Sequence, residues 1–202
     1  GPRVGRFNAD GSANDLPGHN VPMTIAGLMI IIIGFFGFLG ACLIYPAPMA
    51  GSTADAGWLN IYGGATNLSA FAFNTLMSFA GGIIGAYLIT KDPFWMMSGA
   101  LAGIFCAAAG LDLWYPGTAF ALGFLGGVVI PYAHKMITSW GIDDAVGAVS
   151  VHGVCGLIGV LAVGVLLGGY PTHAEGIPAI SFTGQLVGAI AMGLGGFIPG
   201  YV

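Results

Sequence analysis

The chain has 202 residues, of which 56% are hydrophobic and only 6% are charged, and its formal net charge is −4. Soluble domains normally carry about 25% charged residues, so this composition excludes a water-soluble globular domain. It also excludes a nucleic-acid-binding protein, which would need a basic patch. The 37 glycines fit a chain whose natural solvent is lipid, because glycine lets membrane helices approach one another closely.

Six stretches of the chain stay apolar for long enough to cross a bilayer core of about 30 Å, which takes about 20 residues of helix. In chain order they cover residues 21–45, 67–90, 94–113, 116–138, 145–168 and 180–202. Because a backbone inside lipid must satisfy its own hydrogen bonds, each stretch is expected to be a helix. The sequence therefore predicts an all-α fold, a polytopic membrane helix bundle with six transmembrane helices in a single membrane domain, residues 1–202.

The beginning of the chain, residues 1–20, is mainly polar and turn-forming. It starts with Gly1 instead of Met and shows no signal peptide, so we expect the chain to be an internal fragment of a longer protein. Its two basic residues, Arg3 and Arg6, precede the first span.

The four basic residues test the number of spans independently. Besides Arg3 and Arg6, Lys91 lies between the second and third spans, and Lys135 lies near the end of the fourth. With six spans, all of these positions fall on one side of the membrane. The positive-inside rule then predicts that residues 1–20 form a cytoplasmic loop. We accordingly expect a multi-pass protein of the cell (inner) membrane, with both ends of this chain in the cytoplasm.

Small residues recur four positions apart within the predicted helices. The pairs are Gly81/Gly85, Gly99/Gly103, Gly123/Gly127, Gly184/Gly188 and Gly196/Gly200. Such pairs lie on one face of a helix and let a neighbouring helix approach closely. We expect packing within the bundle to explain them better than a separate dimerisation face at each pair.

His152 is the only histidine that lies well inside a predicted span. Ionisable groups inside a membrane are costly to bury and usually functional. An imidazole titrates near neutral pH and is therefore suited to handling protons. Gly153 and Gly156 lie close by and would leave space for a small ligand beside the ring. The alternative is a packed histidine whose ring nitrogens bond to a neighbouring helix.

Other polar groups in or near the spans favour structural roles. Asp143 and Asp144 begin the fifth span, where carboxylates cap free N–H groups and offset the helix dipole. His134 sits near the cytoplasmic end of the fourth span and is expected to reach the interface. Interhelical hydrogen bonds are expected from three further side chains, Asn74, Thr75 and Gln185.

Several segments, taken in chain order, carry a family resemblance. They are Gly1-Pro2-Arg3-Val4-Gly5, Pro17-Gly18-His19-Asn20-Val21-Pro22-Met23, Gly34-Phe35-Phe36-Gly37-Phe38, Phe73-Asn74-Thr75, Ser98-Gly99-Ala100-Leu101-Ala102-Gly103, and Asp143-Asp144-Ala145-Val146 followed by Val151-His152-Gly153-Val154-Cys155-Gly156. The last is the most specific. Together they resemble the second half, helices six to eleven, of ammonium transporters of the Amt/Mep/Rh family.

The resemblance implies an eleven-helix fold whose N-terminus lies outside, so that helix six starts in the cytoplasm as the charges also predict. It implies transmembrane transport of ammonium or ammonia, a homotrimer in the lipid bilayer, and a cytoplasmic regulatory protein as a further partner. It implies neither a cofactor nor an enzyme activity. The residues themselves contain no nucleophile–base set, phosphate-binding loop or metal-ligand cluster.

The family mechanism assigns roles to six positions. Ammonium is recruited at an outer vestibule and loses its proton near an aromatic gate, and nitrogen then crosses a hydrophobic pore lined by paired imidazoles. His152 matches the second imidazole of that pair, and Phe38 matches the inner gate phenylalanine. The remaining pore or substrate-binding positions are Phe35, Cys42, Ile31 and Ala148.

The chain departs from the family pattern at four of the compared positions. Phe35 replaces a tryptophan, Leu39 an asparagine, and Cys42 a vestibule serine. Gly147 stands where the family tends to carry an aspartate, five residues before the pore histidine. A thiol is a weaker hydrogen-bonding group than a hydroxyl, so the outer site is expected to differ.

Two other functions are compatible with these residues. An ammonium sensor on the same fold would carry a signalling domain after this chain. A structural or haem-holding membrane subunit would need facing histidines at matching depth for a haem, whereas only His152 lies deep in a span.

Overall fold

The structure, a computed structural model, describes residues 1–41, 68–170 and 178–201. The helices of these ranges are α1 (Val21–Ala41), α2 (Leu68–Thr90), α3 (Pro93–Ala107), α4 (Pro116–Ser139), α5 (Cys155–Leu166) and α6 (Phe182–Tyr201). A 3₁₀ turn, Ala108–Gly110, extends α3, and a π-helical turn, Val149–Val154, leads into α5. With these extensions, six helices of the described ranges are long and apolar enough to cross a membrane, which confirms the predicted spans.

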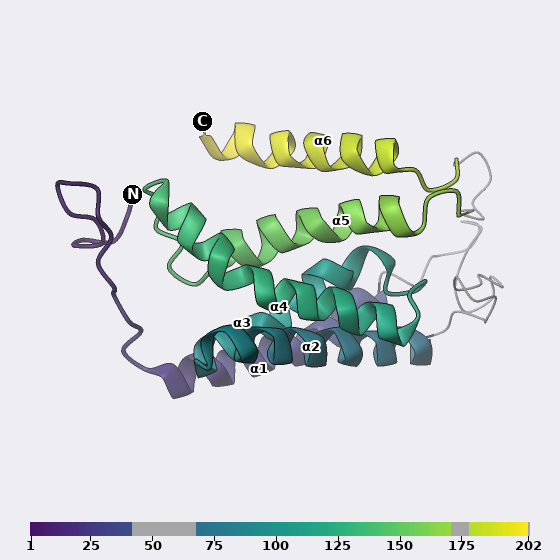
Figure 1. Ribbon diagram of the computed structural model, residues 1–202, viewed down its shortest axis with the longest axis horizontal. Coiled ribbons are helices and arrows are strands. Elements are labelled where there is room, and N and C mark those ends of the chain that lie inside the picture. Colours follow the sequence, from purple (N-terminus) through teal and green to yellow (C-terminus); the bar gives the residue numbers. More distant parts are fainter. Residues whose placement is uncertain (42–67, 171–177, 202) are drawn as a thin grey trace.

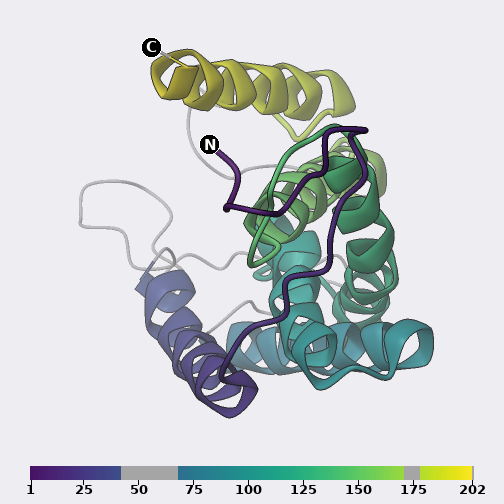
Figure 2. The ribbon, with the colours of Figure 1, turned by 90° about the vertical axis from the view of Figure 1, so that its left-hand side faces the viewer.

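The six helices alternate in direction along the long axis of the bundle (Figure 1). The N-terminal segment, the start of α1 and the end of α6 lie at the same end of it (Figure 1). Helices α2, α3 and α4 pack against one another at the centre. Helix α5 packs on α3, and α6 packs on α5. In both views α1 and α6 lie at opposite edges of the bundle (Figures 1 and 2).

Glycines bring the three central helices into backbone contact. A Cβ atom on Gly127 of α4 would lie 2.1 Å from the carbonyl oxygen of Gly82 in α2. A Cβ on Gly103 of α3 would lie 2.4 Å from the carbonyl oxygen of Ser78, and one on Gly123 only 2.2 Å from the same oxygen. These distances leave no room for a side chain, so the packing predicted for the first three glycine pairs is confirmed.

The last two glycine pairs, both in α6, do not follow that prediction. Within the described part of the chain, nothing lies within 4 Å of a Cβ built on Gly188, Gly196 or Gly200. Helix α6 has no buried residue and touches the bundle mainly through its first turn, where Phe182 packs on Gly164 of α5. The spacing of small residues therefore predicts close packing only where a second helix is present.

Buried polar groups tie the turn after α3 to α2. The amide nitrogen of Asn74 donates to the carbonyl oxygens of Leu111, at 2.8 Å, and Trp114, at 2.7 Å. The indole of Trp114 donates to Ala107, at 2.8 Å. Asn74 thus bridges two elements as expected, whereas the interhelical bond expected for Thr75 is wrong. Its hydroxyl donates to Phe71 of its own helix, because a threonine in a helix can reach back one turn.

Candidate functional site

The fifth span begins with an irregular turn instead of a regular helix. Residues Val149–Val154 form a π-helical turn, which we call the π-turn, and α5 follows directly. Gly147, just before it, has φ +73, a left-handed conformation that suits glycine. The backbone nitrogen of Val151 donates to the carbonyl oxygen of Gly147, at 2.8 Å. Single π-turns within helices frequently occur at functional sites, and this one carries His152.

One carboxylate holds the start of the π-turn. Asp144 is 4% exposed and accepts from the backbone nitrogens of Val149 and Ser150, both at 3.0 Å, and from the Ser150 hydroxyl, at 2.8 Å. The capping role predicted for Asp144 is thereby confirmed. The helical structure starts at Val149, four residues after the predicted start of the span at 145. The start differs because the preceding residues form the turn that brings the Asp144 carboxylate back to the helix.

Asp143 does not share the capping role. Its carboxylate accepts from Arg3 through Nε, at 2.8 Å, Nη2, at 2.9 Å, and the backbone nitrogen, at 2.9 Å. Arg6 Nε lies 3.4 Å from the same carboxylate. These hydrogen bonds from Arg3 hold the pKa of Asp143 well below its ordinary value, and the same bonds raise the pKa of Arg3.

The lowered pKa of Asp143 predicts how this ion pair responds to acid. A group whose pKa falls on folding contributes stability above its unfolded pKa, about 3.9 for aspartate, and loses it as the pH falls toward the folded pKa. The stabilisation lost in Asp143→Asn should therefore be equal at pH 7 and pH 5 and should shrink only below about pH 4. Thermal unfolding of both proteins across this range checks it. A difference in Tm that already vanishes at pH 5 would contradict the assignment.

Three of the six predicted site residues line one cavity. This cavity, about 290 Å³ in volume, lies between α1, α3, the π-turn and the segment that leads into it. His152 contributes from the π-turn and Ala148 from the preceding segment, and Ile31 lines the cavity from α1. The other walls are apolar or small, apart from the hydroxyls of Thr24 and Ser98. The structure thus brings together side chains that are more than 100 positions apart in the chain.

A series of aromatic rings continues from His152 toward α1. The ring of Phe105, on α3, has its centroid 4.2 Å from that of His152. Phe35 meets Phe105 edge to face, with centroids 5.4 Å apart, and its centroid lies 6.1 Å from that of Phe38. Phe105 was not among the residues predicted from the sequence, because nothing in an apolar helix distinguishes one phenylalanine from another before the neighbouring helix is placed.

Of the other three predicted residues, Phe35 belongs to the aromatic series and is not part of the cavity lining. Phe38 contacts Phe35 but is 66% exposed on α1. Cys42 lies outside the described residues. The rings of Phe35 and Phe105 therefore connect Phe38, the predicted gate residue, to His152.

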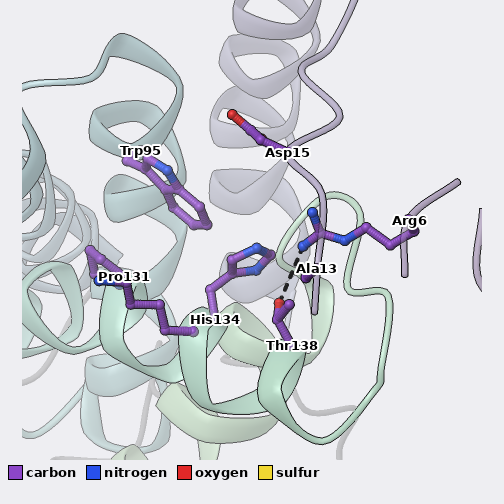
Figure 3. A pocket seen from close by; sticks show the side chains of 8 residues that line it. Arg6, Ala13, Asp15, Trp95, Pro131, His134 and Thr138 are labelled. Carbon is purple, nitrogen blue, oxygen red and sulfur yellow. Dashed lines mark hydrogen bonds between the residues drawn. The ribbon is translucent and has the colours of Figure 1, made fainter. Parts of the chain in front are cut away.

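A second cavity, of about 450 Å³, lies beside the N-terminal segment and contains charged groups (Figure 3). Arg6, His134 and Lys135 line it together with Trp95 and Thr138. The side chain of His134 is partly buried there. The ring packs on Trp95, with centroids 4.9 Å apart, and Nδ1 lies 3.9 Å from the Asp144 carboxylate.

Comparisons with known proteins identify the family. The sequence model of the Ammonium Transporter Family matches residues 1–201. The chain is 31% identical to ammonium transporter Amt1 of Methanocaldococcus jannaschii, over all of this chain and 47% of the relative. It is 32% identical to ammonium transporter Amt2 of Archaeoglobus fulgidus, over 93% of this chain and 38% of the relative.

A solved structure agrees with these relatives. The structure named "Sensor Amt Protein" matches 95% of this chain and 45% of its own, with a TM-score of 0.71 and 29% identity. The chain spans less than half the length of each of these proteins. A family match over nearly every residue, together with six candidate membrane spans, decides the classification. The chain belongs to the Ammonium Transporter Family and is a multi-pass membrane protein.

Proposed function

We propose that this chain contributes half of a pore through which ammonium nitrogen crosses the membrane, and that His152 exchanges a hydrogen bond or a proton with it. The observation that carries the proposal is the shared cavity of about 290 Å³ lined by His152, Ile31 and Ala148. Ammonium is small and its conjugate base is neutral, so a narrow apolar passage favours the neutral form over any cation. An imidazole in that passage can bond to the nitrogen that passes.

The surroundings of His152 support this role over simple packing. The residue is exposed within this chain, and its ring lies beside that of Phe105, with centroids 4.2 Å apart. A packed structural histidine would instead be enclosed, with its nitrogens bonded to neighbouring helices. His152 instead lines the same cavity as Ile31 and Ala148.

An ammonium sensor is the second candidate function, and one specific observation favours it. The matching solved structure is named as a sensor. A sensor and a transporter on this fold would both bind ammonium, but only a transporter carries sustained flux. The two are therefore distinguished by measuring flux in the intact protein, not by measuring binding.

Three further features belong to the same proposal. We expect the end of the bundle that carries Arg3 and Arg6 to face the cytoplasm, since basic residues favour that side. We also expect a homotrimer and a cytoplasmic regulatory protein, which the family resemblance implies. Residues 1–20 would then form a cytoplasmic loop that lies beside the ends of α4 and the π-turn.

Filling the cavity tests the proposed pore. Ala148→Trp places a large indole into a cavity of about 290 Å³ at an exposed position, so the fold should tolerate it while the passage closes. We expect ammonium flux into liposomes that contain the intact protein to fall at least about tenfold, because a blocked constriction stops conduction. The measurement is stopped-flow alkalinisation of the liposome interior after an ammonium jump.

The matched control for this experiment is Val165→Trp, which adds the same side chain on α5 at a residue that is 66% exposed and outside the cavity. We expect this control to retain the flux of the wild-type protein. Unchanged flux in Ala148→Trp, with the same protein density in the liposomes, would contradict the proposed path.

A further inference from the structure

We propose that Arg3, Arg6 and Asp143 form a latch that sets the position of the π-turn and therefore of His152, so that these three are positioning residues for passage through the pore. We call this group the N-terminal latch. The inference rests on the proposed function but adds residues that lie outside the cavity that His152 lines, and two of them, Arg3 and Arg6, are far from His152 in the chain. It assigns the polar N-terminal segment a role in the pore.

Arg3 forms the stronger half of the latch. Its guanidinium donates through two nitrogens to the two carboxylate oxygens of Asp143, and its backbone nitrogen adds a third bond. A forked arginine–carboxylate pair fixes the orientation of both groups, which a lysine cannot do. The Asp143 side chain is only 5% exposed, so this pair is shielded from water on the carboxylate side.

Arg6 ties the same carboxylate to the end of α4. Its side chain is 9% exposed, and its Nε lies 3.4 Å from Asp143. Nη1 donates to the carbonyl oxygen of Asn14, and Nη2 donates to the hydroxyl of Thr138, at 3.4 Å (Figure 3). Arg6 thus joins the N-terminal segment, α4 and the turn before α5 at one point.

The position of Asp143 is transmitted to the π-turn through its neighbour. Asp143 and Asp144 share a peptide bond, and the Asp144 carboxylate holds the first two N–H groups of the π-turn. The segment between them is short and constrained, since Gly147 donates to the Asp144 carbonyl, at 3.1 Å. A shift of Asp143 therefore moves the Asp144 carboxylate, which caps the π-turn as far as Ser150, two residues before His152.

The charge balance around Asp143 explains why the latch needs its carboxylate. Two guanidinium groups meet one carboxylate at Asp143, and Asp144 lies next to it with His134 Nδ1 at 3.9 Å. Lys135 lines the cavity on the same side. Removing the charge of Asp143 leaves these two guanidinium groups close together without a shared carboxylate, and the charge of Arg6, whose side chain is 9% exposed, then lacks its compensating partner.

The test compares Asp143→Asn and Asp143→Glu with the wild-type intact protein in liposomes. Asn removes the charge, and Glu keeps it. Asp10→Asn is the matched control, because among the described residues its carboxylate accepts only from Ser12 of the same segment, through the backbone nitrogen, at 2.9 Å, and the hydroxyl, at 2.6 Å. Two quantities are measured in each protein: amide hydrogen exchange at Val149 and Ser150, and ammonium flux as a function of ammonium concentration.

We expect Asp143→Asn to speed amide exchange at the start of the π-turn about tenfold, because the capped turn opens more often. We expect its maximal flux to fall about three- to tenfold while the ammonium concentration at half-maximal flux changes less than about twofold, since the cavity lining is intact. Asp143→Glu should recover part of both losses, and Asp10→Asn should change neither.

Two results would overturn the latch. The first is unchanged exchange at Val149 and Ser150 in Asp143→Asn. The second is faster exchange with unaltered maximal flux, which would make the ion pairs purely structural. If the wild-type protein carries no ammonium flux at all, the proposed function fails, whereas the exchange measurement still decides whether the latch holds the π-turn.

Discussion

Replacing His152 with alanine is expected to lower ammonium flux through the intact protein at least about tenfold, because proton or hydrogen-bond exchange by a positioned side chain typically contributes 10²–10⁴-fold. The substitution leaves the cavity lined almost entirely by apolar groups, with no ring nitrogen to bond to the passing nitrogen atom. It also removes the ring that lies beside Phe105, with centroids 4.2 Å apart. The fold should survive, since His152 is exposed and makes no described helix-to-helix hydrogen bond within the ranges that the structure covers. Stopped-flow measurements on liposomes give the flux, and thermal unfolding checks the fold.

Two control substitutions separate chemistry from shape at this position. His152→Gln keeps a side chain that can form hydrogen bonds but cannot titrate, so a partial recovery of flux would indicate that bonding alone is sufficient. Val149→Ala removes bulk from a residue on the same π-turn that is 47% exposed. We expect Val149→Ala to keep most of the wild-type flux.

Gly127→Val is expected to prevent assembly of the central three helices. A Cβ atom at this position would lie 2.1 Å from the carbonyl oxygen of Gly82 and 2.8 Å from the backbone nitrogen of Ala86. Both contacts are with backbone, so no side chain can rotate away, and helices α2 and α4 must separate. Overpacking of a well-packed core typically costs about 1–3 kcal/mol, and a backbone clash should exceed the upper value. The measurement is the yield of monodisperse protein and its Tm.

Gly188→Val in α6 is the matched control for this prediction. It makes the same substitution in another membrane helix, at a position where no described atom lies within 4 Å of the new Cβ. We expect a Tm within a few degrees of the wild-type value. A Gly127→Val protein that unfolds at the wild-type temperature would show that α2 and α4 are not in backbone contact.

Most of the fold follows from the sequence, because a bilayer imposes a strong constraint on hydropathy and length. The start of α1 at Val21 and the start of α4 at Pro116 agree with the predicted boundaries. The start of the fifth span differs because Asp144 caps it from outside by folding back, a turn that hydropathy cannot indicate. Helix α6 is exposed although its glycine pairs predict close packing. The reason is that glycine spacing allows a second helix to approach but does not show that one is present.

The candidate site follows from the sequence only in part. Once the family resemblance is recognised, His152, Ile31 and Ala148 can be selected, and the structure places them on one cavity. Phe105 cannot be selected, since its role depends on how α3 packs against the π-turn. The N-terminal latch is also hidden, because Arg3 and Asp143 are 140 residues apart and look like ordinary loop charges.

The alkalinisation of the liposome interior after an ammonium jump, recorded side by side for the wild-type and His152→Ala proteins at equal density, tests the central claim most directly. We predict a protein-dependent flux in the wild-type protein and its loss by at least about tenfold in the variant. Equal fluxes in the two proteins would show that nitrogen does not cross beside His152.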